Sequence, residues 1–213
     1  MYEISTQRGR RVIITGANSG TGKEAAKRLA AAGADIIMAV RNEAKGEEAR
    51  REICQAVCGA SLEVRIVDLS SLESVRVFSQ QLLKEGRPVE LLVNNAGIMA
   101  PPRRELTADG FELQFVTNLL GHFALTNLLL ALLLEAKNPR VTTMTSSAAM
   151  MGKIQFDDLH CERSYKPIAA YAQSKLACLL FANLFYHQLA DQLDQQLPQW
   201  QSALPRKYTA MKF

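Results

Sequence analysis

The chain has few of the residues that mark specialised classes of protein. Of its 213 residues only 7% are aromatic, one is tryptophan and four are cysteine, which excludes a disulfide-stabilised scaffold. Neither charge dominates, because 25 Lys and Arg are set against 21 Asp and Glu, and no basic run is interleaved with aromatic residues. We therefore expect no nucleic-acid partner. With 48% hydrophobic residues, the chain is long enough to form one substantial core.

The cysteines and the hydrophobic stretches indicate a reducing compartment and no membrane span. Cys54 and Cys58 are four residues apart, but no further Cys or His lies at metal-ligand spacing, so we interpret them as free thiols and predict no metal site. The N-terminus has no apolar stretch before the first predicted strand, and the most lipid-like segment, residues 125–134, is too short to cross a bilayer. These features predict a cytoplasmic protein.

Short apolar runs alternate with longer segments of helical periodicity. The runs at residues 12–14, 36–40, 62–67, 89–93 and 141–145 predict strands, and the segments 22–32, 45–57, 72–84, 111–134 and 170–192 predict helices. Continuous apolar strands separated by amphipathic helices indicate a doubly wound parallel α/β sheet, Rossmann-like. We predict one such domain over residues 1–195 and an irregular tail over residues 196–213.

A glycine-rich loop follows the first predicted strand and leads directly into a helix. In T-G-A-N-S-G-T-G, Gly16 permits a sharp turn, Gly20 lets the backbone approach a pyrophosphate, and Gly22 allows close helix packing. A nucleoside-triphosphate loop is the competing interpretation, but Ala17 and Glu24 do not match that motif. The loop therefore predicts a dinucleotide site formed by Gly16, Asn18, Ser19, Gly20, Thr21 and Gly22.

The residues after the second and third strands bear on the choice of cofactor. Arg41 and Asn42 end the second strand, where a guanidinium suits a ribose 2′-phosphate, so NADP(H) is favoured over NAD(H). Arg41 could instead be a solvated loop residue. Asp68, followed by Leu69, could accept a hydrogen bond from the adenine amino group, or it could cap the next helix.

Tyr171 and Lys175 are four residues apart in Y-A-Q-S-K, about two dozen residues after the pair Ser146 and Ser147. One helical turn places the phenol and the ammonium on the same face. A phenol is a weak acid at neutral pH unless a nearby cation favours its phenolate. With the glycine loop upstream, the pair indicates an oxidoreductase that acts on carbonyl and alcohol groups.

Four motifs in order resemble the short-chain dehydrogenase/reductase family: T-G-x-x-x-G-x-G, N-N-A-G at residues 94–97, S-S and Y-x-x-x-K. The resemblance covers about residues 10–190. The stretches A-V-R-N-E-A-K-G, T-N-L-L-G-H-F-A-L-T-N and G-K-I-Q-F-D-D-L look most like retinol-dehydrogenase-type NADP(H)-dependent reductases. This resemblance implies hydride transfer between the cofactor and a small apolar aldehyde, ketone or alcohol.

The resemblance also implies roles for individual residues. Tyr171 would be the general acid or base, Lys175 would bind the nicotinamide ribose, Ser147 would hydrogen-bond the substrate oxygen, and Asn118 would hold a water of the proton relay. The backbone of Asn95, Ala96 and Gly97 would pass close to the adenosine ribose. Taken singly, each catalytic residue has a plainer interpretation: Ser147 as a helix cap, Asn118 as a satisfied polar group, Tyr171 as a half-buried aromatic and Lys175 as a solvated side chain.

The chain departs from the family pattern after the catalytic helix. No sixth strand, Pro-Gly turn or seventh strand is recognisable, so we expect an altered or truncated C-terminus and a sheet incomplete at that edge. The alternative function is therefore that of a cofactor-binding but non-catalytic relative. Met150, Met151 and Phe156 could line the substrate pocket or be ordinary packing residues. The apolar helices 111–134 and 170–189 resemble a dimer-forming pair and allow a homodimer.

Overall fold

The computed structural model of the chain describes residues 4–196 and contains a five-stranded parallel sheet. The strands are β1 (Arg11–Thr15), β2 (Asp35–Val40), β3 (Ser61–Ile66), β4 (Leu91–Asn94) and β5 (Arg140–Thr143). Their spatial order is β3-β2-β1-β4-β5, with Val12 beside Ile36 on one side and beside Leu91 on the other. The chain changes direction across the sheet between β1 and β4. In open parallel sheets, ligands bind at the carboxyl ends of the strands at such a point.

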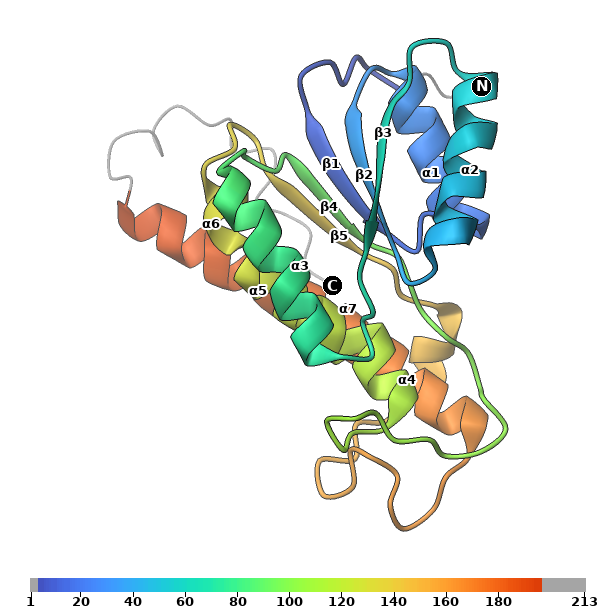
Figure 1. Cartoon of the computed structure of the whole chain (residues 1–213). Helices are drawn as coiled ribbons and strands as arrows, with labels where there is room; N and C mark the ends of the chain where they lie inside the picture. The colour runs from blue at the N-terminus through green and yellow to red at the C-terminus, as the bar shows by residue number, and fades with distance from the viewer. Residues whose placement is uncertain (1–3, 197–213) are drawn as a thin grey trace.

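Helices cover both faces of the sheet, as the doubly wound prediction required (Figure 1). α1 (Gly20–Ala31) and α2 (Glu43–Ala56) lie on one side, while α3 (Leu72–Glu85), α5 (Gly121–Leu128) and α7 (Pro167–Gln196) lie on the other. Alternate strand residues enter two separate cores: Val12 and Ile14 pack with the α1–α2 side, and Ile13 packs with Leu125 on the α3–α5 side. Because both faces are buried, the strands read as continuous apolar runs. The fold prediction is confirmed.

The predicted helix 111–134 is wrong as one continuous element. It consists of α4 (Leu113–Phe115), the π-helical turn η1 (Val116–Leu120), α5 and α6 (Leu130–Leu134). The second break lies at Leu129, whose backbone leaves the helical region at φ −92° and ψ 3°. A π turn inserts an extra residue into the helix and often accompanies a functional site. Here it contains Asn118.

The catalytic helix begins earlier than predicted, at Pro167 rather than at residue 170. Proline suits the first helical position because the amide hydrogen it lacks would have had no partner inside the helix. Before this helix come the short 3-10 helix η2 (Ser147–Met151) and a loop over residues 152–166. The predicted tail over residues 196–213 lies outside the described residues, apart from Gln196, which ends α7.

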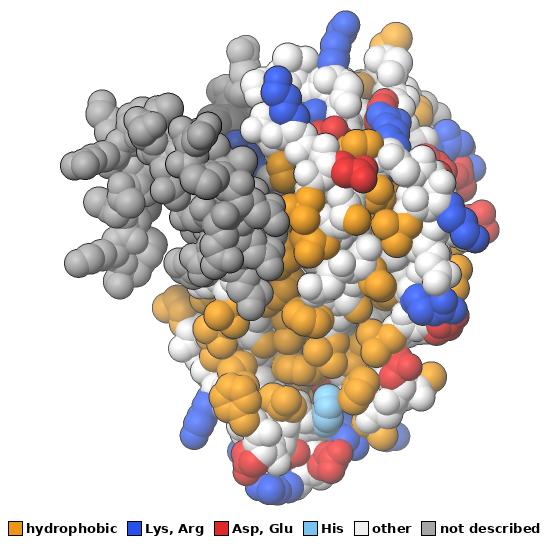
Figure 2. Space-filling model, turned by 90° about the vertical axis from the view of Figure 1, so that its left-hand side faces the viewer, with side chains coloured by type: hydrophobic (Ala, Val, Ile, Leu, Met, Phe, Trp, Pro, Cys, Tyr) orange, Lys and Arg blue, Asp and Glu red, His pale blue; other side chains and the backbone are white. Residues whose placement is uncertain are grey.

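An apolar surface runs over α5 and α7. Phe123, Leu179, Leu180 and Leu184 are each more than 40% exposed, and Phe123 packs against Phe181 with ring centroids 5.5 Å apart. Figure 2 shows hydrophobic side chains gathered on the face where these helices lie. The homodimer expected from this pair of helices stays a prediction.

Hydropathy singles out a different segment from the one expected. Residues 125–134 are divided between α5 and α6, whereas Pro167–Phe185 of α7 is long and apolar enough to cross a bilayer, with a mean hydropathy of 1.3. That helix also packs against η1, η2 and β5, and 39% of its apolar window is buried in the protein. Core helices commonly show this composition, and the absence of a membrane span stays a prediction.

Candidate active site

The glycine loop packs directly against the backbone that follows β4. Gly16 has φ +66°, and a Cβ added there would lie 3.0 Å from both Cα and Cβ of Ala96. A Cβ on Gly22 would lie 2.5 Å from the Gly16 carbonyl oxygen and from Nδ2 of Asn95. Only glycine fits at these two positions, because any larger residue would separate the loop from the β4 segment.

The start of α1 offers free backbone donors to an anion. Ser19 is the N-cap residue, but its side chain makes no capping hydrogen bond, and the first turn contains no acidic residue. Ser19, Gly20 and Thr21 are exposed, and Asn18 beside them is half-buried. Unpaired amide hydrogens at a helix N-terminus, together with the helix dipole, favour a phosphate. These residues therefore fit the pyrophosphate of a dinucleotide, and their contact with a cofactor stays a prediction.

Arg41 and Asn42 lie at the carboxyl end of β2, where both side chains are exposed. Asn42 caps α2, because its Oδ1 accepts a hydrogen bond of 2.9 Å from the Lys45 amide. The guanidinium of Arg41 can therefore approach a ribose 2′-phosphate at this edge of the site, with the α2 N-terminus beside it.

Asp68 is not the cap of α3. That role belongs to Ser71, while Oδ1 of Asp68 accepts hydrogen bonds from the Ser70 amide at 2.9 Å and from the Ser70 hydroxyl at 2.6 Å. Of the two interpretations of Asp68, helix capping is excluded, and contact with the adenine stays a prediction. Leu69 is buried in the core, so only its backbone could reach a cofactor.

A buried threonine joins the two halves of the cofactor site. Oγ1 of Thr15 accepts hydrogen bonds from the Asn95 amide at 2.9 Å and the Ala96 amide at 3.0 Å, and Nδ2 of Asn95 donates to the Thr15 carbonyl at 2.9 Å. The predicted residues Asn95, Ala96 and Gly97 are thus fixed beside the glycine loop. Thr15 was not singled out from the sequence, although its place at the end of β1, directly before Gly16, was a usable signal.

Lys175 is buried rather than solvated, with only 4% of its surface exposed. Its Nζ donates to the Met144 carbonyl at the end of β5 at 3.1 Å and lies 5.9 Å from the centroid of the Tyr171 ring. A Cβ on Gly97 would come within 3.4 Å of this Nζ, so the ammonium also lies against the backbone after β4. A buried cation needs further hydrogen-bond partners, and the ribose hydroxyls of a nicotinamide nucleotide would supply them.

Asn118 connects the β4 loop to the catalytic helix. Its Oδ1 accepts from the Ile98 amide at 2.8 Å, and its Nδ2 donates to the Ile98 carbonyl at 3.0 Å and to Oγ of Ser174 at 2.9 Å. Ser174 in turn donates to the Tyr171 carbonyl at 2.7 Å. The side chain is therefore satisfied by protein groups and positions the turn that carries Tyr171. The predicted water-holding role stays a prediction.

Ser147 is exposed, and the helix cap is its neighbour. Oγ of Ser146 accepts from the Ala148 amide at 3.2 Å and caps η2. The capping interpretation of Ser147 is therefore wrong, which leaves its hydroxyl available to a substrate. Met150, Met151 and Phe156 are 89%, 75% and 84% exposed, so ordinary core packing does not explain them either.

Sequence reasoning also missed His122, which is completely buried next to Asn118. Its Nδ1 lies 3.0 Å from the Asn118 carbonyl oxygen, and its Nε2 lies 2.9 Å from Oγ1 of Thr15. Burial lowers the pKa of His122 to about 4, and the positive charge of Lys175 acts in the same direction. The ring is therefore neutral at pH 7. Its spacing of four residues from Asn118 was the signal in the sequence.

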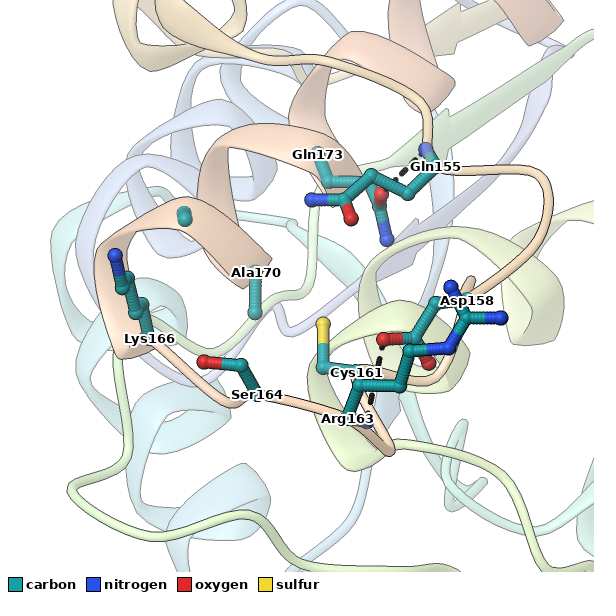
Figure 3. A pocket seen from close by; sticks show the side chains of 9 residues that line it. Gln155, Asp158, Cys161, Arg163, Ser164, Lys166, Ala170 and Gln173 are labelled. Atoms are coloured by element: carbon teal, nitrogen blue, oxygen red, sulfur yellow. Dashed lines mark hydrogen bonds between the residues drawn. The ribbon is translucent and has the colours of Figure 1, made fainter.

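The loop over residues 152–166 and the first turns of α7 enclose a pocket of about 240 Å³. Figure 3 shows the side chains of Gln155 and Gln173 on one side of it and Arg163 and Asp158 on another, and the Gln155 amide donates to Oε1 of Gln173 at 2.9 Å. No predicted catalytic or cofactor-binding residue lines this pocket. It is therefore separate from the site formed by Tyr171 and Lys175.

The parallel sheet, the glycine loop at its switch point and the buried Lys175 beside Tyr171 define an α/β protein with the dinucleotide-binding type of fold. The sequence pattern of the short chain dehydrogenase family matches residues 10–195. The chain belongs to this family, and the resemblance seen in its motifs is confirmed.

Individual relatives agree with this assignment. Human retinol dehydrogenase 14 is 47% identical over 186 residues, which cover 81% of this chain and 55% of that protein. The crystal structure of a Mycobacterium paratuberculosis protein is 44% identical, with a TM-score of 0.79 over 89% of this chain and 66% of the other. A metagenomic short-chain oxidoreductase in complex with NADP is 25% identical, with a TM-score of 0.68 over 90% of this chain and 79% of the other. The chain spans about half the length of the curated relatives it matches.

Proposed function

We propose that the protein is an NADP(H)-dependent oxidoreductase that interconverts an apolar aldehyde or ketone and its alcohol. The observation that carries this proposal is the arrangement of Tyr171 and the buried Lys175. The ammonium lies 5.9 Å from the centre of the Tyr171 ring and close to Gly97 in the segment after β4. That segment is itself hydrogen-bonded to Thr15 at the end of β1. An ordinary surface pair on a helix would have no reason to bury its lysine.

The residues present suggest the following division of labour. When bound, the nicotinamide cofactor supplies or accepts the hydride. Tyr171 gives its proton to the developing alkoxide during reduction and takes it back in the reverse direction. The exposed hydroxyl of Ser147 donates a hydrogen bond to the same oxygen, where negative charge develops. Lys175 holds the ribose and keeps a positive charge next to the phenol.

Arg41 supports the preference for NADP(H). A guanidinium at the carboxyl end of β2 can bind a phosphate with paired, charge-assisted hydrogen bonds, while it offers no acceptor to a free 2′-hydroxyl. The structure of a related short-chain oxidoreductase was solved in complex with NADP, which is consistent with the same cofactor here.

The exposed side chains near Ser147 support an apolar substrate. Met150, Met151 and Phe156 present flexible or flat apolar surface close to the predicted catalytic serine in sequence. Some of the relatives are named retinol dehydrogenases, which is consistent with an apolar alcohol or aldehyde. The substrate class is accordingly proposed as aliphatic and polyene carbonyl compounds.

Fluorescence titration and turnover measured on the same preparation test this function. NADPH should bind saturably and more tightly than NADH, and turnover with aliphatic aldehydes and retinal should be measurable. Tyr171→Phe should retain NADPH binding and lose turnover by about a thousandfold, within the range expected for a general acid. Equal affinities for the two cofactors would reject the role of Arg41. NADPH binding with no carbonyl reduced across a broad panel would support the non-catalytic alternative.

A further inference from the structure

The buried ring of His122 lies between two parts of the site and is within hydrogen-bond distance of both. On one side is Thr15, which ends β1 and precedes the glycine loop. On the other is the main-chain carbonyl of Asn118 in the π turn. All three residues are buried: Thr15 is 0% exposed, and Asn118 and His122 are each 1% exposed.

The hydrogen-bond partners fix the protonation of the ring. The Asn118 carbonyl can only accept, so Nδ1 must carry the hydrogen and Nε2 must be the acceptor. Oγ1 of Thr15 already accepts from the amides of Asn95 and Ala96, so both of its lone pairs are occupied. Its own hydrogen is therefore directed at Nε2, which is closer at 2.9 Å than the alternative acceptor, the Val93 carbonyl, at 3.3 Å.

The result is a path of hydrogen bonds from the cofactor site to Asn118, whose side chain makes separate bonds toward the catalytic helix. It runs from the Asn95 and Ala96 amides through the Thr15 hydroxyl and the His122 ring to the Asn118 carbonyl. The side chain of Asn118 then continues through Ser174 to the carbonyl of Tyr171. Buried groups linked in this way have one satisfied arrangement, and displacing one of them leaves its neighbours unpaired.

We propose that His122 is a positioning residue that couples the glycine loop to the π turn, so that the cofactor site and the Asn118 turn keep one relative placement. The test by NADPH binding and turnover rests on the proposed function. The test by hydrogen exchange depends only on the contacts of His122. The ring is only 1% exposed, so it can act only through the groups packed against it. Its effect is transmitted through Thr15 on one side and Asn118 on the other.

Two substitutions separate the two contacts, because each keeps one polar position of the imidazole. His122→Asn places an amide nitrogen where Nδ1 lies, so it keeps the bond to the Asn118 carbonyl and loses the bond to Thr15. His122→Gln places an amide oxygen where Nε2 lies, so it keeps the Thr15 contact and loses the Asn118 contact. We expect His122→Asn to weaken NADPH binding roughly tenfold with little change in the single-turnover rate at saturation. His122→Gln should lower that rate roughly tenfold with little change in affinity.

Cys178→Ala is the matched control. The Sγ of Cys178 donates to the same Asn118 carbonyl at 3.2 Å and makes no hydrogen bond to Thr15. This variant should leave NADPH affinity within about twofold, because a thiol is a weak donor and the Thr15 contact stays intact. The proposal would be overturned if both His122 variants changed NADPH affinity and single-turnover rate equally, in proportion to their loss of melting temperature. That result would show that His122 only stabilises the fold.

Hydrogen exchange provides a test that does not depend on activity or on cofactor binding. The amides of Asn95 and Ala96 should exchange several times faster in His122→Asn than in wild type, while exchange in residues 116–123 stays close to wild type. His122→Gln should show the reverse pattern. If one or both variants do not fold, Thr15→Val provides the test from the other end. It removes the acceptor of the Asn95 and Ala96 amides and leaves Nε2 of the intact ring buried and unpaired, whereas His122→Asn has no atom at that position. Thr15→Val should therefore accelerate exchange at Asn95 and Ala96 and also in residues 116–123. Unchanged exchange in residues 116–123 of Thr15→Val, or the same pattern in both His122 variants, would refute the coupling.

Discussion

The two halves of the site are stabilised by different physical means. The half that includes β1, β2 and the glycine loop is formed by fully buried apolar strands and by glycines at positions where a Cβ would collide with backbone. The half that includes the π turn and α7 is held by buried polar side chains bonded to backbone far away in sequence. Under the proposed function, cofactor binding would therefore depend on shape and exposed amides, whereas catalysis would depend on a hydrogen-bond network.

The largest expected effect is in the catalytic half, at Lys175. Lys175→Met should lower turnover by at least about a hundredfold and also weaken NADPH binding, because the charge beside Tyr171 and the ribose donor are lost together. Steady-state kinetics and cofactor titration measure both. Lys27→Met, an exposed position on α1, is the control and should change neither. If turnover of Lys175→Met stayed within a few-fold of wild type, Lys175 would have no role in the reaction.

The same half should make stability sensitive to mild acid through His122. The pKa of this ring is lowered from 6.5 to about 4 in the folded protein, so between these pH values the unfolded chain binds a proton that the folded chain does not. Its contribution is complete above pH 6.5 and is lost as the pH falls toward 4, to a total of roughly 3 kcal/mol. Two residues of α7 also act on this environment: the charge of Lys175 lowers the pKa of His122 further, and Cys178 donates to the same Asn118 carbonyl as the ring.

Urea unfolding at a series of pH values measures this contribution. The wild-type free energy of unfolding should fall more steeply between pH 6.5 and 4 than that of His122→Gln, whose side chain does not titrate. If the free energy of unfolding depended on pH in the same way for both proteins, the ring would take up its proton at the same pH in the folded and the unfolded chain. That result would contradict the hydrogen bonds assigned to the neutral ring.

In the cofactor half, a single methyl group should be enough to disturb the site. Gly16→Ala combines the left-handed backbone, which costs about 1 kcal/mol, with a contact of 3.0 Å to Ala96, so NADPH binding should weaken at least about tenfold. Gly59→Ala has a similar φ of +72° but open space around it. It should show the backbone penalty in thermal unfolding without any loss of affinity. Similar affinities for the two variants would contradict the close packing inferred for the loop.

The smallest expected effect concerns the choice between cofactors. Arg41→Ala should weaken NADPH binding by about tenfold and leave NADH binding nearly unchanged, since only the 2′-phosphate contacts the guanidinium in this account. Arg51→Ala, an exposed position further along α2, tests for a general effect of charge. Equal losses for both cofactors in Arg41→Ala would place Arg41 outside the phosphate site.

The contrast between the halves also explains which features could be predicted from the sequence. The strands, the glycine loop and the pairing of Tyr171 with Lys175 are local patterns of apolar runs, glycine spacing and one helical turn. The π turn is different, since the predicted helix 111–134 has continuous helical periodicity and the break depends on tertiary contacts. Thr15, His122 and Ser174 were missed because the partners that give them a role lie far away in the chain: Thr15 and His122 are 107 residues apart, and Ser174 is 56 residues from Asn118. Their positions next to recognised motifs were weak signals, and only the fold shows which residues they contact.

Single-turnover oxidation of NADPH is the measurement that tests the central claim most directly. Wild-type protein saturated with NADPH is mixed with excess apolar aldehyde, and the reduced nicotinamide is followed by its absorbance while the alcohol is quantified. The account predicts one equivalent of alcohol formed for each NADPH consumed, and no reaction in Tyr171→Phe carrying the same bound cofactor. Saturable NADPH binding without any alcohol, or equal rates in the wild type and Tyr171→Phe, would contradict it.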